Sequence, residues 1–155
     1  MVSAAPNRRS KSRGFTLLEV MITVAIVGVL TSIALPMYYE QVIRSKLIDG
    51  TGKLGEFKGK MDRYWQDNRT YLNGAACGIP NPVVTGSDYF QITCGAPGPL
   101  PTATSYTIWA SGIAAKGTAN FRFTIDNTDA KTSSGPAGWL GSGTCWAIRK
   151  DGSCF

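Results

Sequence analysis

Histidine is missing from the sequence, and its absence removes several kinds of chemistry. None of the 155 residues is His, so neither a Ser-His nor a Cys-His nucleophile pair can form. The carboxylates show no paired spacing of the kind that glycoside hydrolases use. We therefore expect no enzymatic activity, no catalytic residue and no cofactor.

The C-x-x-C step of structural zinc sites is also missing. The four cysteines are Cys77, Cys94, Cys145 and Cys154. Without histidine a zinc site would need all four. An even number of cysteines in a small exported domain is typical of disulfides instead. We expect two disulfides and no metal, and the three possible pairings stay open at this point.

Acidic residues are absent from the first 14 positions, where basic residues gather. The formal charge of +6 comes from 16 basic and 10 acidic residues. Arg8, Arg9, Lys11 and Arg13 are four of the basic ones, so 12 remain against the 10 acidic residues. This near balance gives no general reason to expect binding to a polyanion.

An uninterrupted apolar run follows, from Phe15 to Leu35, with Glu19 as its one charge. As a helix it would be about 30 Å long, enough to cross a bilayer core. The preceding basic residues hold that side in the cytoplasm. An ordinary secretory signal would have a shorter run with a small residue after it, whereas here Gly14 precedes the run. A plain membrane anchor would leave the carboxylate without a role.

The string from Arg13 to Val20, RGFTLLEV, resembles the prepilin signature of type IV pilins and pseudopilins. The resemblance implies that a dedicated prepilin peptidase and methyltransferase cuts after Gly14 on the cytoplasmic side. It also implies N-methylation of the new terminus at Phe15, and an assembly role for Glu19.

Glu19 has a physical reason to serve assembly. After cleavage, the amine of Phe15 would lie among apolar helices, where a carboxylate from a neighbouring subunit could neutralise it. The alternative is that Glu19 pairs with the amine of its own chain, one turn away.

The resemblance implies an α+β pilin fold. Its parts are a long N-terminal helix with a projecting apolar half, an antiparallel sheet of about four strands, and two disulfides. The helix would reach about Gln66 and be interrupted near Pro36. The predicted parts are a cleaved leader (1–14), a transmembrane and filament-core half (15–36) and a periplasmic head (37–155).

One face of the second helix half carries apolar or small residues at steps of three and four. These are Ile43, Leu47, Gly50, Leu54, Phe57, Met61 and Tyr64. The string Gly50-Thr51-Gly52-Lys53-Leu54-Gly55 fits G-x-G-x-x-G, but a dinucleotide site needs a preceding strand. We interpret its glycines as points of close contact between helix and sheet.

Residues 68–87 have the composition of a loop, and three segments after it alternate like strands. They are Tyr89–Cys94, Tyr106–Ile113 and Phe121–Asp126, with a possible short fourth strand at Cys145–Arg149. In that layout Cys145–Cys154 closes a hairpin, and Cys77–Cys94 ties the loop to the first strand. The tail resembles that of minor pilins of the PilE type.

We therefore predict a structural subunit, major or minor, of a type IV pilus that acts in assembly, adhesion or twitching motility. Its partners would be other pilin subunits, the processing enzyme and, before assembly, the bacterial inner membrane; the mature protein would be extracellular. Two alternatives stay open. One is a pseudopilin of type II secretion. The other is a DNA-uptake pilin with a patch of Trp109, Trp139, Trp146, Lys116, Arg122, Arg149 and Lys150.

Overall fold

The computed structural model describes residues 14–80, 89–139 and 141–154. The chain forms two units, residues 1–39 and residues 40–155. Every described residue of the core, and both disulfides, belong to the second unit. We refer to this second unit as the head.

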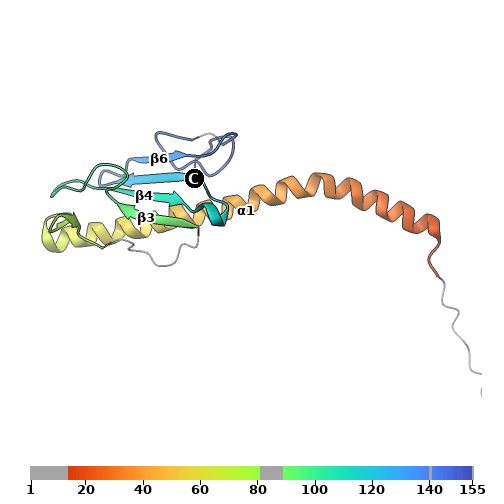
Figure 1. Ribbon diagram of the computed structural model, residues 1–155, viewed down its shortest axis with the longest axis horizontal. Coiled ribbons are helices and arrows are strands. Elements are labelled where there is room, and N and C mark those ends of the chain that lie inside the picture. Colours follow the sequence, from red (N-terminus) through yellow and green to blue (C-terminus); the bar gives the residue numbers. More distant parts are fainter. Residues whose placement is uncertain (1–13, 81–88, 140, 155) are drawn as a thin grey trace, which may run out of the picture. The chain divides into compact units, whose positions relative to one another are not determined.

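One helix, α1 (Leu17–Asn68), takes in both the apolar run and the first part of the head (Figure 1). The predicted interruption at Pro36 is wrong for this chain, because Pro36 lies inside the continuous helix. A proline removes one backbone hydrogen bond and crowds the preceding turn. Here the helix continues on both sides of Pro36 in spite of that one missing hydrogen bond.

The head half of α1 buries the stripe that the sequence predicts. Its fully buried side chains are Leu47, Leu54, Phe57 and Met61. Gly50 is also buried, and a Cβ there would approach the Phe90 ring to 2.5 Å.

The predicted close contact is therefore confirmed for Gly50. It is wrong for Gly52 and Gly55, where an added Cβ would meet nothing. These two glycines face open space on the helix.

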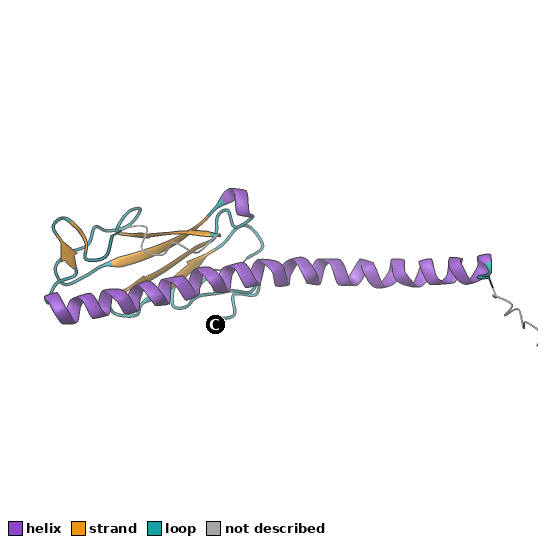
Figure 2. Ribbon diagram, turned by 90° about the horizontal axis from the view of Figure 1, so that it is seen from below, coloured by secondary structure: helices purple, strands orange, loops and turns teal. Residues whose placement is uncertain are grey.

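A four-stranded antiparallel sheet packs on this half of the helix (Figure 2). Its strands, in spatial order, are β3 (Phe90–Cys94), β4 (Thr107–Gly112), β5 (Arg122–Asp126) and β6 (Lys131–Ser134). Alternate side chains point to opposite faces of a sheet. The buried ones that fill the core with the helix stripe are Phe90, Ile92, Ile108, Ala110, Phe123 and Ile125.

The fourth strand is not where the sequence places it. It is β6, which is polar, whereas Cys145–Arg149 forms only the isolated bridge of Ala147 with Cys154. The predicted loop after the helix holds a small hairpin of β1 (Leu72–Asn73) and β2 (Ala76–Cys77). A short 3-10 helix, η1 (Ala114–Lys116), joins β4 to β5.

Candidate assembly site and C-terminal loop

The start of α1 is capped by a residue of the prepilin-like string itself. Thr16 Oγ1 accepts a hydrogen bond from the backbone N–H of Glu19 at 3.2 Å. A Thr at the cap with Glu three residues later is the capping-box pattern. This role was missed in the sequence, although T-x-x-E before an apolar run is the signal that indicates it. Gly14 and Phe15 precede the helix and are exposed.

Glu19 lies in the first turn of α1 and is exposed. An anion is favoured at this end of a helix because the backbone dipole is positive there. None of the ion pairs within the described residues involves its carboxylate. In the single chain, Glu19 is therefore available to a partner from outside.

The large apolar side chains of the first helix half are exposed all around the helix. Phe15 is 83% and Leu30 is 61% exposed. This helix is long and apolar enough to cross a membrane, and none of its most apolar stretch is buried within the chain. So large an apolar surface requires a covering medium, either lipid or other helices.

Three hydroxyls within this apolar half are satisfied by the helix itself. Thr23 Oγ1 donates to the carbonyl of Val20, at 2.8 Å. Thr31 and Ser32 make equivalent bonds to backbone carbonyls of the preceding turn. Such internal bonds let a hydroxyl enter hydrocarbon without losing a partner.

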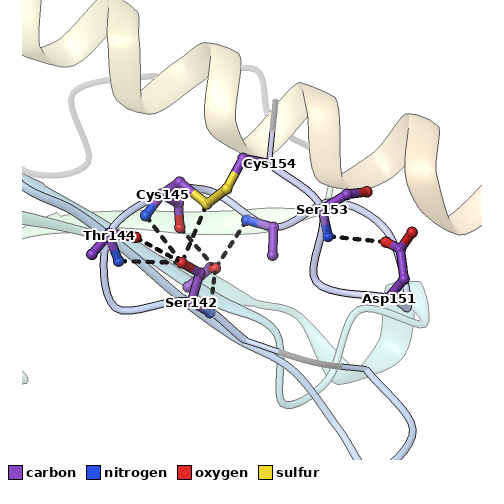
Figure 3. Close-up of a disulfide and its surroundings, with 8 residues drawn as sticks. Ser142, Thr144, Cys145, Asp151, Ser153 and Cys154 are labelled. Carbon is purple, nitrogen blue, oxygen red and sulfur yellow. Dashed lines mark hydrogen bonds between the residues drawn. A yellow bond between two sulfur atoms is a disulfide. The ribbon is translucent and has the colours of Figure 1, made fainter.

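Two disulfides close loops of the head, with the pairing that the predicted layout favours. Cys77 pairs with Cys94, which ties β2 to β3, and both residues are buried. Cys145 pairs with Cys154 across the C-terminal loop, and Cys154 is exposed (Figure 3). The chain thus has one internal and one surface disulfide.

The side chain of Ser133, on β6, holds the start of the C-terminal loop. Its Oγ donates to the carbonyl of Cys145 at 3.0 Å and accepts from the N–H groups of Ser142 and Ala147. The backbones of Ser133 and Ser142 also exchange two hydrogen bonds. A polar strand therefore anchors the tail that the sequence suggested would itself be a strand.

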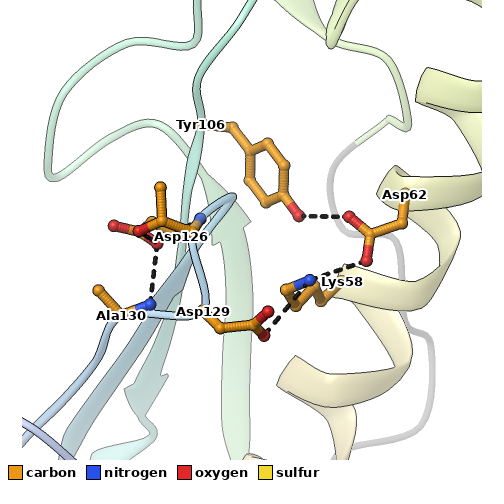
Figure 4. A network of polar contacts seen from close by, with 7 residues as sticks. Lys58, Asp62, Tyr106, Asp126, Asp129 and Ala130 are labelled. Carbon is orange, nitrogen blue, oxygen red and sulfur yellow. Dashed lines mark hydrogen bonds and ion pairs between the residues drawn. The ribbon is translucent and has the colours of Figure 1, made fainter.

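A polar network joins the helix to the β5–β6 turn (Figure 4). Lys58 Nζ lies 2.8 Å from Asp62 Oδ2 and 3.3 Å from Asp129 Oδ1. The hydroxyl of Tyr106 donates to Asp62 Oδ1 at 3.4 Å. Burial, together with the negative charge of Asp62, raises the pKa of Tyr106. The network links α1 to the sheet at the turn between β5 and β6.

The tryptophans of the suggested DNA patch do not form a free stacking surface. Trp146 is buried, and its Nε1 donates to the carbonyl of Thr124 at 2.8 Å. Trp139 packs edge-on against Phe121.

Three further members of that patch are engaged in contacts within the head. The Arg122 guanidinium lies over the Trp109 ring. Lys150 Nζ lies 3.7 Å from a carboxylate oxygen of Glu40. The core interpretation of the tryptophans therefore fits better than base stacking.

Comparisons with known proteins agree with this architecture. A family model described as "Prokaryotic N-terminal methylation motif" matches residues 9–35. A second, described as "Type IV minor pilin ComP, DNA uptake sequence receptor", matches residues 36–122, more than half of the chain.

Individual relatives point the same way. Fimbrial protein EcpC of Eikenella corrodens is 35% identical over 118 residues, covering 70% of this chain and 76% of the relative. A probable minor fimbrial protein of Dichelobacter nodosus is 41% identical over 66 residues, covering 43% and 42%. The non-core minor pilin PilV of Neisseria meningitidis shares the fold, with a TM-score of 0.52 at 15% identity, over 63% of this chain and 92% of PilV.

This chain belongs to the type IV minor pilins. It is a structural subunit of a type IV pilus, membrane-anchored as a precursor, and it assembles with other pilin subunits. The pilus interpretation therefore holds over the pseudopilin one.

Proposed function

We propose that the chain enters the pilus after peptidase cleavage following Gly14 and N-methylation of Phe15. Glu19 of one subunit then neutralises the terminal amine of a neighbour. The leader (1–14) stays in the cytoplasm, and the helix half at 15–36 passes from the membrane into the filament core. The predicted periplasmic part (37–155) occupies the periplasm before assembly.

The observation that carries this proposal is the isolated carboxylate of Glu19. It is the one charge on a fully exposed apolar helix half, and it has no ion-pair partner within the described residues. A carboxylate in an apolar medium costs about 2.5–3.5 kcal/mol at the centre of a membrane helix. A cationic amine from another subunit offsets that cost, and the pairing selects one axial position.

The test compares Glu19→Gln with Thr16→Val. The first variant removes the charge and keeps the shape, whereas the second removes the cap and keeps the charge. We expect the Glu19→Gln subunit to insert and be cleaved but to appear at least about tenfold less in fibres, since an unpaired buried charge is costly. Thr16→Val should lose about 1 kcal/mol of helix stability and still assemble. Quantitative mass spectrometry of purified fibres measures both.

Two outcomes would contradict the docking role. Normal incorporation of Glu19→Gln is the first. The second is an equal loss of assembly in both variants, which would assign the defect to the helix start rather than to the charge.

A second candidate function is reception of DNA during uptake, supported by the ComP-type match over residues 36–122. Because Trp146 and Trp139 pack internally and the Arg122 guanidinium lies over Trp109, this head would contact DNA through phosphates and not through stacked bases. Lys116 and Arg149 are exposed cations without an ion pair within the described residues. They are the first candidates for such contacts.

Salt-dependent binding of duplex DNA to the full chain in detergent tests this function. Each lost phosphate contact should lower the slope of log affinity against log salt by about 1. Lys116→Gln and Arg149→Gln should each show that change, and the control Lys53→Gln, whose lysine pairs with Glu56, should not. Absence of binding at low salt would remove the DNA function and leave the pilus role intact.

A further inference from the structure

The outer face of the sheet, opposite the helix, carries a cross-strand row with a single charge. The register pairs Gln91 with Ser111, Ser111 with Arg122, and Arg122 with Ser134. Directly paired residues of an antiparallel sheet share one face. Two serine hydroxyls therefore flank one guanidinium on neighbouring strands.

This row borders a polar hollow of about 340 Å³. Its lining residues are Ser111, Gly112, Asn120, Phe121, Arg122 and Ser134. Asn120 is held in the left-handed backbone region at φ 66°, a conformation that asparagine tolerates better than most residues. The turn that contains Asn120 thus forms one wall of the hollow.

Arg122 is positioned but not neutralised. The guanidinium carbon lies 5.5 Å from the centre of the Trp109 ring, a cation–π contact that orients it. Within residues 14–80, 89–139 and 141–154, Arg122 forms no ion pair. In the same described residues, no hydrogen bond engages the side chains of Arg122, Ser111, Ser134 or Asn120.

We propose that this hollow binds the oxyanion group, carboxylate or phosphate, of a small polar ligand. The planar fork of Arg122 matches two oxygens of either group. The hydroxyls of Ser111 and Ser134 and the amide of Asn120 can bond the remaining polar atoms. A volume near the lower end for ligand pockets suits a sugar acid or a sugar phosphate.

Alternative uses of the same surface fit less well. The Trp109 ring already carries the guanidinium, so it offers no free platform for a nucleic-acid base. Recognition must therefore rely on charge and hydroxyl groups, which is a property separate from both the pilus role and duplex DNA binding.

The test titrates the full chain, in a zwitterionic detergent, with D-glucuronate and separately with inorganic phosphate, and uses D-glucose as the neutral control. NMR shifts of the Trp109 indole follow binding next to the guanidinium. We expect saturable binding of an oxyanion in the millimolar range and none of glucose. Arg122→Gln should weaken the binding about tenfold or more, because charge-assisted bonds are lost.

Lys131→Gln is the matched control. Lys131 also lies over an indole ring, that of Trp146, at 4.8 Å from its centre, so the variant removes the same charge outside the hollow. Its affinity should equal that of the natural chain. Tighter binding of glucuronate indicates a carboxylate ligand, and tighter binding of phosphate indicates a phosphate ligand; either result supports the site.

Ser134→Glu gives an independent test. It places a carboxylate directly across the strand pair from Arg122, within reach of the guanidinium. Binding should be lost while the thermal unfolding of the head is unchanged. The proposal would be overturned if this variant kept full affinity, or if Arg122→Gln and Lys131→Gln lost affinity equally. Binding of glucose equal to that of the oxyanions, or no saturation up to tens of millimolar, would also overturn it.

Discussion

The two halves of α1 share one backbone helix, but different surroundings stabilise them. Leu30 in the first half is 61% exposed, whereas Leu54 in the second is fully buried. The first half is apolar on every side, and the second is apolar along one stripe only. A uniformly apolar helix is a surface for lipid or for other helices, whereas a striped one belongs to the core of its own chain.

This difference separates folding from assembly along the helix. The described core and both disulfides lie within the head. Mutations in the head half should therefore change the head's free energy of unfolding, and mutations in the first half should change insertion and assembly instead.

The largest expected contrast comes from one substitution made in both halves. Leu54→Ala should lower the free energy of unfolding of the head by about 2–5 kcal/mol, since it leaves a cavity in the core. Leu30→Ala should change it by less than about 0.5 kcal/mol. Denaturant titration of the full chain in detergent, followed by tryptophan fluorescence, measures both. Equal effects would contradict the division of the helix.

Removing the internal disulfide should have the next largest effect. Cys77→Ser with Cys94→Ser should cost the head about 3 kcal/mol, the scale expected for a loop of this length.

The surface pair, Cys145 and Cys154, should be reduced first by a thiol, because Cys154 is exposed and Cys77 and Cys94 are buried. Timed alkylation with peptide mapping checks the order, and earlier loss of Cys77–Cys94 would contradict it.

Three glycines of α1 sharpen the comparison further. Gly52→Ala faces open space and should stabilise the head by up to about 1 kcal/mol. Gly50→Ala collides with the Phe90 ring and should cost about 1–3 kcal/mol. Gly28→Ala, in the first half, should not change head stability. Thermal unfolding of the three variants tests whether the stability of the head depends on the head half of α1 and not on the first half.

The smallest effect concerns Tyr106 and depends on pH. Its pKa is raised in the folded head by burial and by the charge of Asp62. At pH values below about 10, the ordinary pKa of tyrosine, Tyr106 is protonated in both the folded and the unfolded chain, and its contribution to the stability of the head is fully present. Above that pH the unfolded chain ionises first, so stability falls as the pH rises.

Tyr106→Phe should therefore flatten the loss of stability above about pH 10 and cost about 1 kcal/mol or less at neutral pH. Unfolding midpoints between neutral and alkaline pH provide the measurement. An unchanged alkaline slope would show that other groups dominate it.

Periodic patterns explain how much of this fold the sequence predicts. The steps of three and four along α1 identify its buried stripe, and the alternation around Phe123 identifies β5. In contrast β6 consists of Lys131, two serines and a threonine, whose composition gives no strand signal. Its position depends on pairing with β5 and on a bond from Ser133 to Cys145, which lies outside the strand.

The site was predictable to a similar extent. Glu19 stands out as the one charge of an apolar run, and the resemblance to the prepilin signature implies the roles of Gly14 and Phe15. The row that contains Arg122 has no such signal in the sequence. That row joins residues from four strands, and only the register brings them together. The continuity of α1 through Pro36 was also beyond prediction, since a local rule for proline ignores the turns that support it.

The anchoring of the C-terminal loop has a consequence for protein engineering. One hydroxyl, on Ser133, fixes the backbone at Ser142, Cys145 and Ala147, and a disulfide closes the loop at Cys154. Between these fixed points Ile148 is buried in the core, whereas Lys150 and Asp151 are exposed. This exposed pair is therefore a surface position where a foreign peptide could be inserted without disturbing the core.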